Sequence, residues 1–283
     1  MENKIGTSAT TRSVFRWISD ERLGMLDSYC SDCAKREYTK FDSLDQAFVS
    51  LEYPKISDND REALEHYSGF SHFSLNRAAK GTWSYEDNGN MEMHNTYNQY
   101  VEEMCGAIEN NQSSIGNVRV YRGVPIKYFR EYGISSIDDL EMLNGQYLLD
   151  RGFVSTSLVE DECFYRKDPK NGVNYNVMIE YLVPEEFTDG IIMGGVSHYE
   201  EEGEYLINVW NMAQVTGVRK ESDDRAVVQA MLVPKRVYDE SYDIKAELAK
   251  WKVVIYIYLF VKKFVHIVIS VRCFIMKNKL INT

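Results

Sequence analysis

The hydrophobic period of the sequence changes once along the chain, and this change restricts the fold more than any other feature. Between residues 92 and 109, apolar residues such as Met93, Met104 and Ile108 recur at the spacing of one helix face. After the polar break at residues 110–117 the apolar residues alternate, as they do in β-strands. Because helices precede strands instead of alternating with them, we predict an α+β fold with a mostly antiparallel sheet system.

Two shorter helices are expected before this point. Ser57 and Asp60 have the spacing of a helix N-cap, and the helix that they open should stop at Gly69, because glycine is favoured just after a helix. A second helix should follow and end near Gly81. The polar residues 1–55 suit one or two helices of a lead-in segment and show no recognisable chemistry.

Alternating apolar residues predict at least five strands in the second half of the chain. They cover residues 118–124, 151–158, 175–183, 204–210 and 226–233. Together with the helices before them, these strands predict a folded domain over residues 56–240, with a separate tail over residues 241–283.

The two ends of the chain bear on export and on membrane attachment. The N-terminal residues lack an apolar stretch, so no ordinary secretory signal peptide is expected. The tail is apolar over residues 253–276, but Lys262 and Lys263 lie near its centre, where charges are costly in a bilayer. We therefore favour a tail that is buried, associates with another surface or is foreign to the domain, and a membrane anchor is the alternative.

Charge and cysteine content restrict the partners. The net charge of −11 argues against a nucleic-acid partner, because phosphate contacts are made by Lys and Arg. An acidic surface fits a small-molecule or protein substrate better. The five scattered cysteines imply no disulfide framework. Cys30 and Cys33 have metal-site spacing but lack a second pair and a nearby His, so no metal is predicted.

An acidic loop runs into the expected strand 204–210. Glu202 and Glu204 are two residues apart, and in extended backbone their side chains leave on the same side. Two carboxylates directed at one point repel each other, so the arrangement suggests a cation or a reaction. A solvated acidic turn is the alternative.

Two further polar groups interrupt expected strands. Arg122 lies in strand 118–124, and its planar guanidinium matches a phosphate or a carboxylate; a structural ion pair is the alternative. Ser155, Thr156 and Ser157 place three hydroxyls in a row, where they can bond to neighbouring side chains. The alternative for these three residues is a polar edge strand.

In this order, the arginine, the Ser-Thr-Ser run and the Glu-x-Glu pair resemble the R-S-E signature of arginine-type ADP-ribosyltransferases of the bacterial toxin family. Tyr67-Ser68-Gly69 and Ser74-Leu75-Asn76-Arg77 resemble the helical-lobe signature of the exoenzyme subfamily, which includes binary actin-modifying toxins and Rho-modifying exoenzymes. The resemblance covers about residues 55–235. It implies the ADP-ribosyltransferase fold, with an N-terminal helical lobe packed on a mostly antiparallel two-sheet β core.

The resemblance also implies roles for the two glutamates and for the residues around them. Glu204 would stabilise the positive charge that develops on the ribose of NAD when nicotinamide leaves. Glu202 would position and help to deprotonate the acceptor, with Tyr199 as the aromatic residue of the toxin-turn loop. Arg122 would hold the NAD phosphates, and Ser155 would orient Glu204.

The remaining residues of the resemblance would form the walls of the NAD site. Thr156 and Ser157 would shape the nicotinamide side, while Tyr67 and Asn76 would complete the wall. Gly123 stands where relatives often have a second arginine, and residues 188–195 lack the further phosphate-binding arginine of the family. NAD binding that is weaker or differently arranged is therefore expected.

The expected activity is mono-ADP-ribosylation of a protein arginine with NAD as substrate and without a metal. A glutamate at position 202, where the Rho-modifying branch has glutamine, favours an arginine acceptor. An NAD glycohydrolase and a catalytically silent module are the alternatives, and a glycosidase is weaker. The partners implied are NAD and a target-cell protein, reached by secretion, by injection or with a separate carrier, and no nucleic acid; a phage enzyme acting in its own host is a further option.

Overall fold

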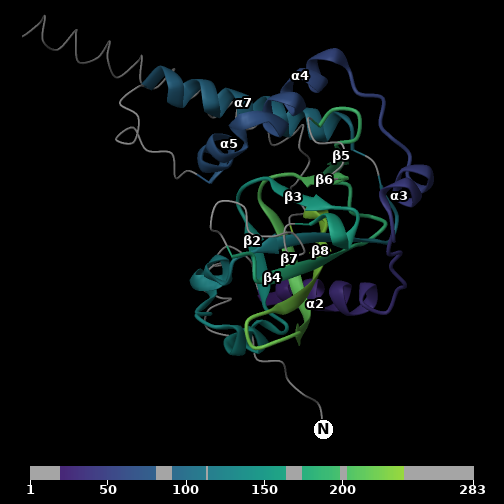
Figure 1. Cartoon of the computed structure of the whole chain (residues 1–283), viewed down its shortest axis with the longest axis vertical. Helices are drawn as coiled ribbons and strands as arrows, with labels where there is room; N and C mark the ends of the chain where they lie inside the picture. Colours follow the sequence, from purple (N-terminus) through teal and green to yellow (C-terminus); the bar gives the residue numbers. More distant parts are fainter. Residues whose placement is uncertain (1–19, 81–90, 113, 164–173, 198–202, 239–283) are drawn as a thin grey trace, which may run out of the picture. The chain divides into compact units, whose positions relative to one another are not determined.

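The chain folds in the order that the sequence predicts, with helices first and strands afterwards. The computed structural model describes residues 20–80, 91–112, 114–163, 174–197 and 203–238 (Figure 1). The α-helices are α2 (Asp20–Cys33), α3 (Leu44–Ser50), α4 (Asp58–His66), α5 (His72–Ala79), α7 (Met91–Asn110) and α8 (Lys235–Tyr238). The strands are β1 (Val118–Val124), β2 (Tyr147–Asp150), β3 (Val154–Ser157), β4 (Val177–Val183), β5 (Gly190–Ile192), β6 (Glu204–Ile207), β7 (Asn211–Lys220) and β8 (Ala226–Val233). The α+β prediction is confirmed.

The predicted start of α4 is confirmed at atomic level. The Oγ atom of Ser57 accepts a hydrogen bond from the backbone N–H of Asp60 at 3.2 Å, as an N-cap residue does. The helix ends at His66 and continues through a wide turn, Tyr67–Ser71, into α5. Gly69 lies in this turn with non-helical backbone angles, so the chain changes direction close to the glycine that the sequence marked.

The strands form one hydrogen-bonded series in the order β2-β7-β8-β4-β1-β3-β6-β5. The β4–β8 pair is parallel, and the other strand pairs of the described chain are antiparallel. The two-sheet core that the resemblance implies is not confirmed as two separate sheets. However, the junction between β1 and β3 is narrow, because it consists of the single pair Tyr121 and Ser157.

Two predicted strands have different limits in the structure. The expected strand 151–158 is only β3, because the chain turns between Asp150 and Val154 and joins two separate strands. The expected strand 204–210 stops at Ile207. Trp210 has a φ of 56°, which an extended strand cannot contain, so the chain turns there and enters β7. The strands β2, β5 and β7 lie outside the five predicted ranges.

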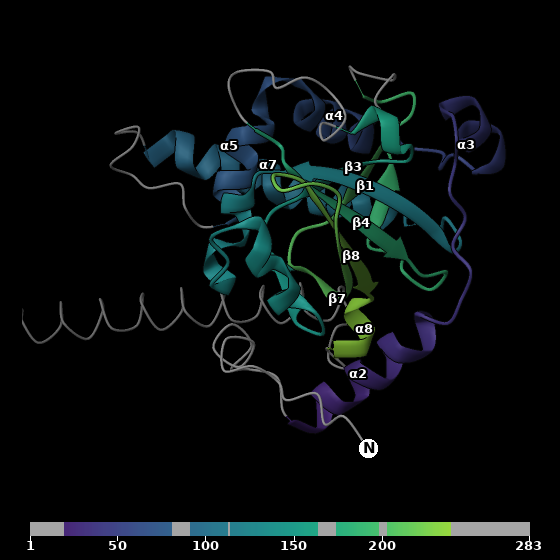
Figure 2. The same ribbon diagram turned by 60° about the horizontal axis from the view of Figure 1, so that its bottom comes forward.

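Helices cover two different parts of the β core (Figures 1 and 2). Helix α2 packs on β2, β7 and β8 through a cluster that contains Leu26, Tyr147 and Met231. Helices α4, α5 and α7 pack on β5, β6 and Phe153, the residue before β3, in a cluster that also contains Leu64 and Leu206. The second group is the helical lobe that the resemblance implies, and its contact with β3 and β6 brings Tyr67 and Asn76 to the strands of the R-S-E signature.

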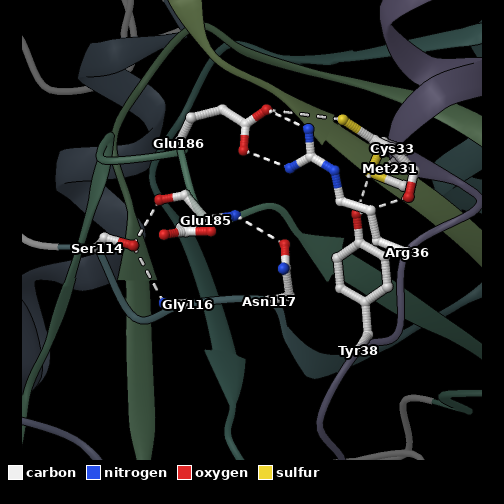
Figure 3. A network of polar contacts seen from close by, with 9 residues as sticks. All are labelled: Cys33, Arg36, Tyr38, Ser114, Gly116, Asn117, Glu185, Glu186 and Met231. Atoms are coloured by element: carbon white, nitrogen blue, oxygen red, sulfur yellow. Dashed lines mark hydrogen bonds and ion pairs between the residues drawn. The ribbon is translucent and has the colours of Figure 1, made fainter.

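A polar network holds the end of α2 against the β core (Figure 3). Arg36 donates two hydrogen bonds to the Glu186 carboxylate, at 2.6 and 2.9 Å, and the Cys33 thiol lies 3.7 Å from the same group. The Tyr38 hydroxyl donates to the Cys33 carbonyl. Cys30 is also a buried free thiol, and burial raises its pKa to about 12, so it is unreactive at neutral pH.

The described residues show neither a metal site nor a membrane-spanning helix. Among them there is no group of three or more side chains that could hold a metal ion. They also contain no helix that is both long enough and apolar enough to cross a membrane. The tail 241–283 lies outside the described residues.

Candidate active site

A single cavity of about 230 Å³ brings together eight of the ten site residues expected from the sequence. They are Tyr67, Asn76, Arg122, Gly123, Ser155, Thr156, Ser157 and Glu204. They come from the turn after α4, from α5 and from strands β1, β3 and β6, so the cavity lies where the helical lobe meets the narrow junction of the sheet. The other two, Tyr199 and Glu202, lie outside the described residues.

Glu204 is the first residue of β6 and is almost fully buried, with 7% of its surface exposed. In the antiparallel pairing of β3 with β6, Ser157 is the residue directly opposite Glu204. Opposite residues of an antiparallel pair share one face of the sheet, so the hydroxyl of Ser157 and the carboxylate of Glu204 belong to the same face. Ser155 lies two residues along the same face, opposite Leu206.

Thr156 has its side chain on the other face of β3. Its hydroxyl donates a hydrogen bond of 2.6 Å to the backbone carbonyl of Tyr205, the residue that follows Glu204. The side chain of Thr156 therefore fixes β6 against β3 beside the carboxylate. This contact ties the Ser-Thr-Ser run physically to the glutamate strand.

Tyr67 and Asn76 form one wall of the cavity. The amide of Asn76 donates to the Tyr67 hydroxyl at 3.2 Å, and the Tyr67 ring packs edge-on against Phe153 at 5.4 Å. Burial raises the pKa of Tyr67, and the nearby Glu204 carboxylate raises it further. Tyr67 therefore stays a neutral phenol that can donate a hydrogen bond.

Arg122 lines the same cavity from strand β1. Its Nη1 atom lies 3.7 Å from Asp150, and its guanidinium lies 5.9 Å from the centre of the Tyr128 ring. Burial works against its charge, but Asp150 and the surrounding tyrosine hydroxyls raise the pKa of Arg122 overall. Arg122 is thus a fixed positive charge at the cavity.

The structure adds residues that the sequence analysis missed. His72, Tyr121, Glu162, Cys163 and Tyr175 also line the cavity. They lie on different elements, and no motif connects them. Only a periodicity argument on strand 118–124 could have indicated Tyr121, the neighbour of Arg122.

Three buried polar atoms of the cavity have no hydrogen-bond partner within the described chain. They are the Asn76 Oδ1 atom, the Arg122 Nη1 atom and the Tyr121 hydroxyl. Unsatisfied buried polar atoms are rare and costly unless a ligand or water meets them. A cation donor, an amide acceptor and a hydroxyl in one cavity fit NAD, which carries both an anionic pyrophosphate and hydrogen-bonding hydroxyl and amide groups.

Gly152, just before β3, leaves room that the side chains of Asn76 and Lys80 occupy. A Cβ atom there would lie 2.5 Å from Asn76 Oδ1 and 2.6 Å from Lys80 Cε. We expect Gly152→Ala to displace both side chains and to weaken NAD binding by about tenfold, since displacing one good hydrogen bond changes affinity by that order. Isothermal calorimetry with NAD measures this. Gly106→Ala is the control, because a Cβ atom there meets nothing within 4 Å, and an unchanged affinity in Gly152→Ala would contradict the prediction.

Known structures share this fold at low sequence identity. The C3 exoenzyme of Clostridium limosum is 15% identical, with a TM-score of 0.54 over 70% of this chain and 98% of its own. C3stau2 from S. aureus, solved with NAD, is 17% identical, with a TM-score of 0.56 over 71% and 100%. The Vis toxin of Vibrio splendidus is 18% identical, with a TM-score of 0.50 over 78% and 89%.

The family comparison covers more than half of the chain. No curated protein sequence matches it significantly. The model of the ADP-ribosyltransferase exoenzyme family matches residues 34–235, which include every described residue of the cavity. The chain therefore belongs to the ADP-ribosyltransferase exoenzyme family, the bacterial-toxin type of mono-ADP-ribosyltransferase.

Proposed function

We propose that this protein transfers ADP-ribose from NAD to an arginine side chain of a target protein and releases nicotinamide. The observation that supports this most is the meeting of Arg122, the Ser-Thr-Ser strand and Glu204 with Tyr67 and Asn76 in one cavity. The residues supply a cation for phosphate, hydroxyls and amides for the polar groups of NAD, and a buried carboxylate for developing positive charge.

In this proposal Glu204 stabilises the transition state more than the ground state. When the bond between ribose C1 and the nicotinamide nitrogen breaks, its electron pair leaves with nicotinamide and positive charge develops at C1. A buried carboxylate stabilises that charge strongly, because little water is present to screen it. Strand β6 pairs with β3, with Ser157 opposite Glu204, so the backbone of Glu204 is held in place before the reaction.

The acceptor that we propose is the guanidinium group of an arginine. Glu202 would accept the proton that the attacking guanidinium nitrogen loses as its bond to C1 forms. The related Vis protein, 19% identical with a TM-score of 0.51, has been solved with agmatine, a compound that carries a guanidinium group. A guanidinium acceptor is consistent with that complex and with the glutamate at position 202. We propose that the acceptor belongs to a protein of the target cell, which the enzyme reaches by secretion or injection.

The test separates transfer from hydrolysis. We expect Glu202→Gln to lower transfer of labelled ADP-ribose to protein by roughly 10²-fold or more, since general-base catalysis contributes that much, while nicotinamide release to water continues. Wild type and variant are incubated with labelled NAD and cell lysate, and label on protein and free ADP-ribose are measured together. Mass spectrometry of the labelled proteins then identifies the acceptor residue.

The neighbouring Glu201→Gln variant is the matched control and should keep its transfer activity. Free ADP-ribose without labelled protein in the wild type would contradict the transferase and favour an NAD glycohydrolase. Label on a residue other than arginine would contradict the acceptor. A wild-type protein that neither binds nor consumes NAD would favour the catalytically silent module.

A further inference from the structure

Asp150, the last residue of β2, lies at the centre of a polar network beside the cavity. Only 5% of its surface is exposed. The Tyr128 hydroxyl donates to its Oδ2 atom at 2.8 Å, and the Gly152 N–H donates to its Oδ1 atom at 3.2 Å. Two cations face the same carboxylate, with Lys80 Nζ at 3.4 Å and Arg122 Nη1 at 3.7 Å.

The charges of this network are coupled. A buried carboxylate is costly without cations, and two cations this close repel each other without a carboxylate. The Tyr128 hydroxyl remains a donor, because burial and Asp150 both raise its pKa far above its usual value. Asp150 is therefore held by two neutral donors and in turn fixes Arg122 and Lys80.

The ion pair leaves Arg122 free to bind a ligand. At 3.7 Å from Asp150, the Arg122 Nη1 atom makes no hydrogen bond, so its donor capacity stays available. Lys80 keeps 37% of its side chain exposed and lies about one helical turn beyond Asn76, and both side chains crowd Gly152. Asp150 thus holds two cations next to the wall of the NAD cavity.

The first cavity is small for a dinucleotide, and a second cavity lies on the other side of Asp150. At about 230 Å³ the first cavity falls below the roughly 300–1,000 Å³ common for ligand sites. A second cavity, of about 280 Å³, is lined by Lys80, Tyr128, Glu131, Leu149, Asp150 and Arg151. Arg122 lines the first cavity and Lys80 lines the second, and both cations contact the Asp150 carboxylate, so the two cavities lie on either side of one charge network.

We propose that Asp150 is a positioning residue that holds Arg122 and Lys80 as a paired cation site for the pyrophosphate of NAD. The inference rests on the proposed function, because it assumes that NAD occupies the first cavity. It accounts for the glycine after Arg122 and for the absence of arginine in residues 188–195, since Lys80 supplies the second positive charge.

The test is Asp150→Asn, which keeps the shape and an acceptor for Tyr128 but removes the charge. In metal sites, mutating a residue that holds a metal ligand in place lowers the affinity for the metal by roughly 10- to 100-fold. We expect an increase of about tenfold or more in the Kd of NAD and of ADP-ribose by calorimetry. The kcat for nicotinamide release at saturating NAD should change by less than about threefold, since positioning acts on binding.

Two further variants keep the test decisive if Asp150→Asn folds poorly. Lys80→Met, on a partly exposed side chain, should also raise the Kd of NAD, and Tyr128→Phe should raise it less because the charge remains. In the Asp150→Asn protein, Lys80→Met should have a smaller effect than in wild type, which is the expected sign of coupling.

Glu180→Gln is the matched control. Glu180 accepts a 2.7 Å hydrogen bond from Arg119, another arginine of β1, outside both cavities. An equal rise in Kd in this control, an unchanged Kd in Asp150→Asn, or a loss confined to kcat would overturn the positioning role. Wild-type protein that fails to bind NAD would instead contradict the proposed function as a whole.

Discussion

Glu204→Gln is expected to lower the kcat for nicotinamide release from NAD by about 10²–10³-fold, the range measured when one group that stabilises transition-state charge is removed. Glutamine has nearly the same shape but no negative charge. It can still accept a hydrogen bond from the substrate, so the Kd of NAD should change little. The measurements are initial rates at saturating NAD and calorimetric affinity for NAD.

Glu204 is buried at the start of β6 and lies opposite Ser157 in the sheet. Because glutamine fills the same space, the substitution leaves no cavity, and we expect the melting temperature to change by only a few degrees. A variant with normal kcat would exclude Glu204 as the catalytic carboxylate, and weaker NAD binding in that variant would assign Glu204 to binding instead.

Arg122→Met is expected to destabilise the fold and to abolish tight NAD binding. Breaking a buried ion pair costs roughly 3–5 kcal/mol, because the remaining charge stays buried. We expect a smaller cost, about 1–2 kcal/mol, because the Arg122 side chain is 22% exposed, its contact with Asp150 is not a hydrogen bond, and Lys80 still faces Asp150. The Kd of NAD should rise by roughly 10²-fold with the loss of a charged phosphate contact.

A double variant separates stability from binding. Arg122→Met combined with Asp150→Asn removes both charges, so the free energy of unfolding in urea should recover part of the loss, while NAD binding should not recover. If Arg122→Met is as stable as wild type, the contact with Asp150 does not contribute to folding. If the double variant binds NAD normally, Arg122 does not hold the phosphates.

The predicted helices and the predicted strand ladder depend on different kinds of information. The N-cap at Ser57 and the stripe that became α7 are local patterns, because their causes lie within a few residues, and both are confirmed. The limits of β6 were missed, because the positive φ of Trp210 depends on how the chain turns into β7. Tyr238, far along the chain, donates a hydrogen bond to the Trp210 carbonyl and holds that turn.

The sequence by itself determined the fold class and the order of the motif residues along the chain. Arg122, the Ser-Thr-Ser run and Glu204 follow one another on separate strands, and this order was sufficient for the family resemblance. The acidic loop with Glu202 remains a sequence-based prediction. A linear motif can state residue types and spacing, because both are local properties of the chain.

Only the tertiary structure decided which side chains act together. Strand pairing placed Ser157 opposite Glu204, and packing of the short strand β2 brought Asp150 to Arg122 and Lys80. Asp150 lies 28 positions after Arg122 and belongs to a strand that alternation did not reveal. Burial gives these contacts their strength, and burial depends on residues distant in sequence, so the sequence could name the arginine but not the carboxylate that holds it.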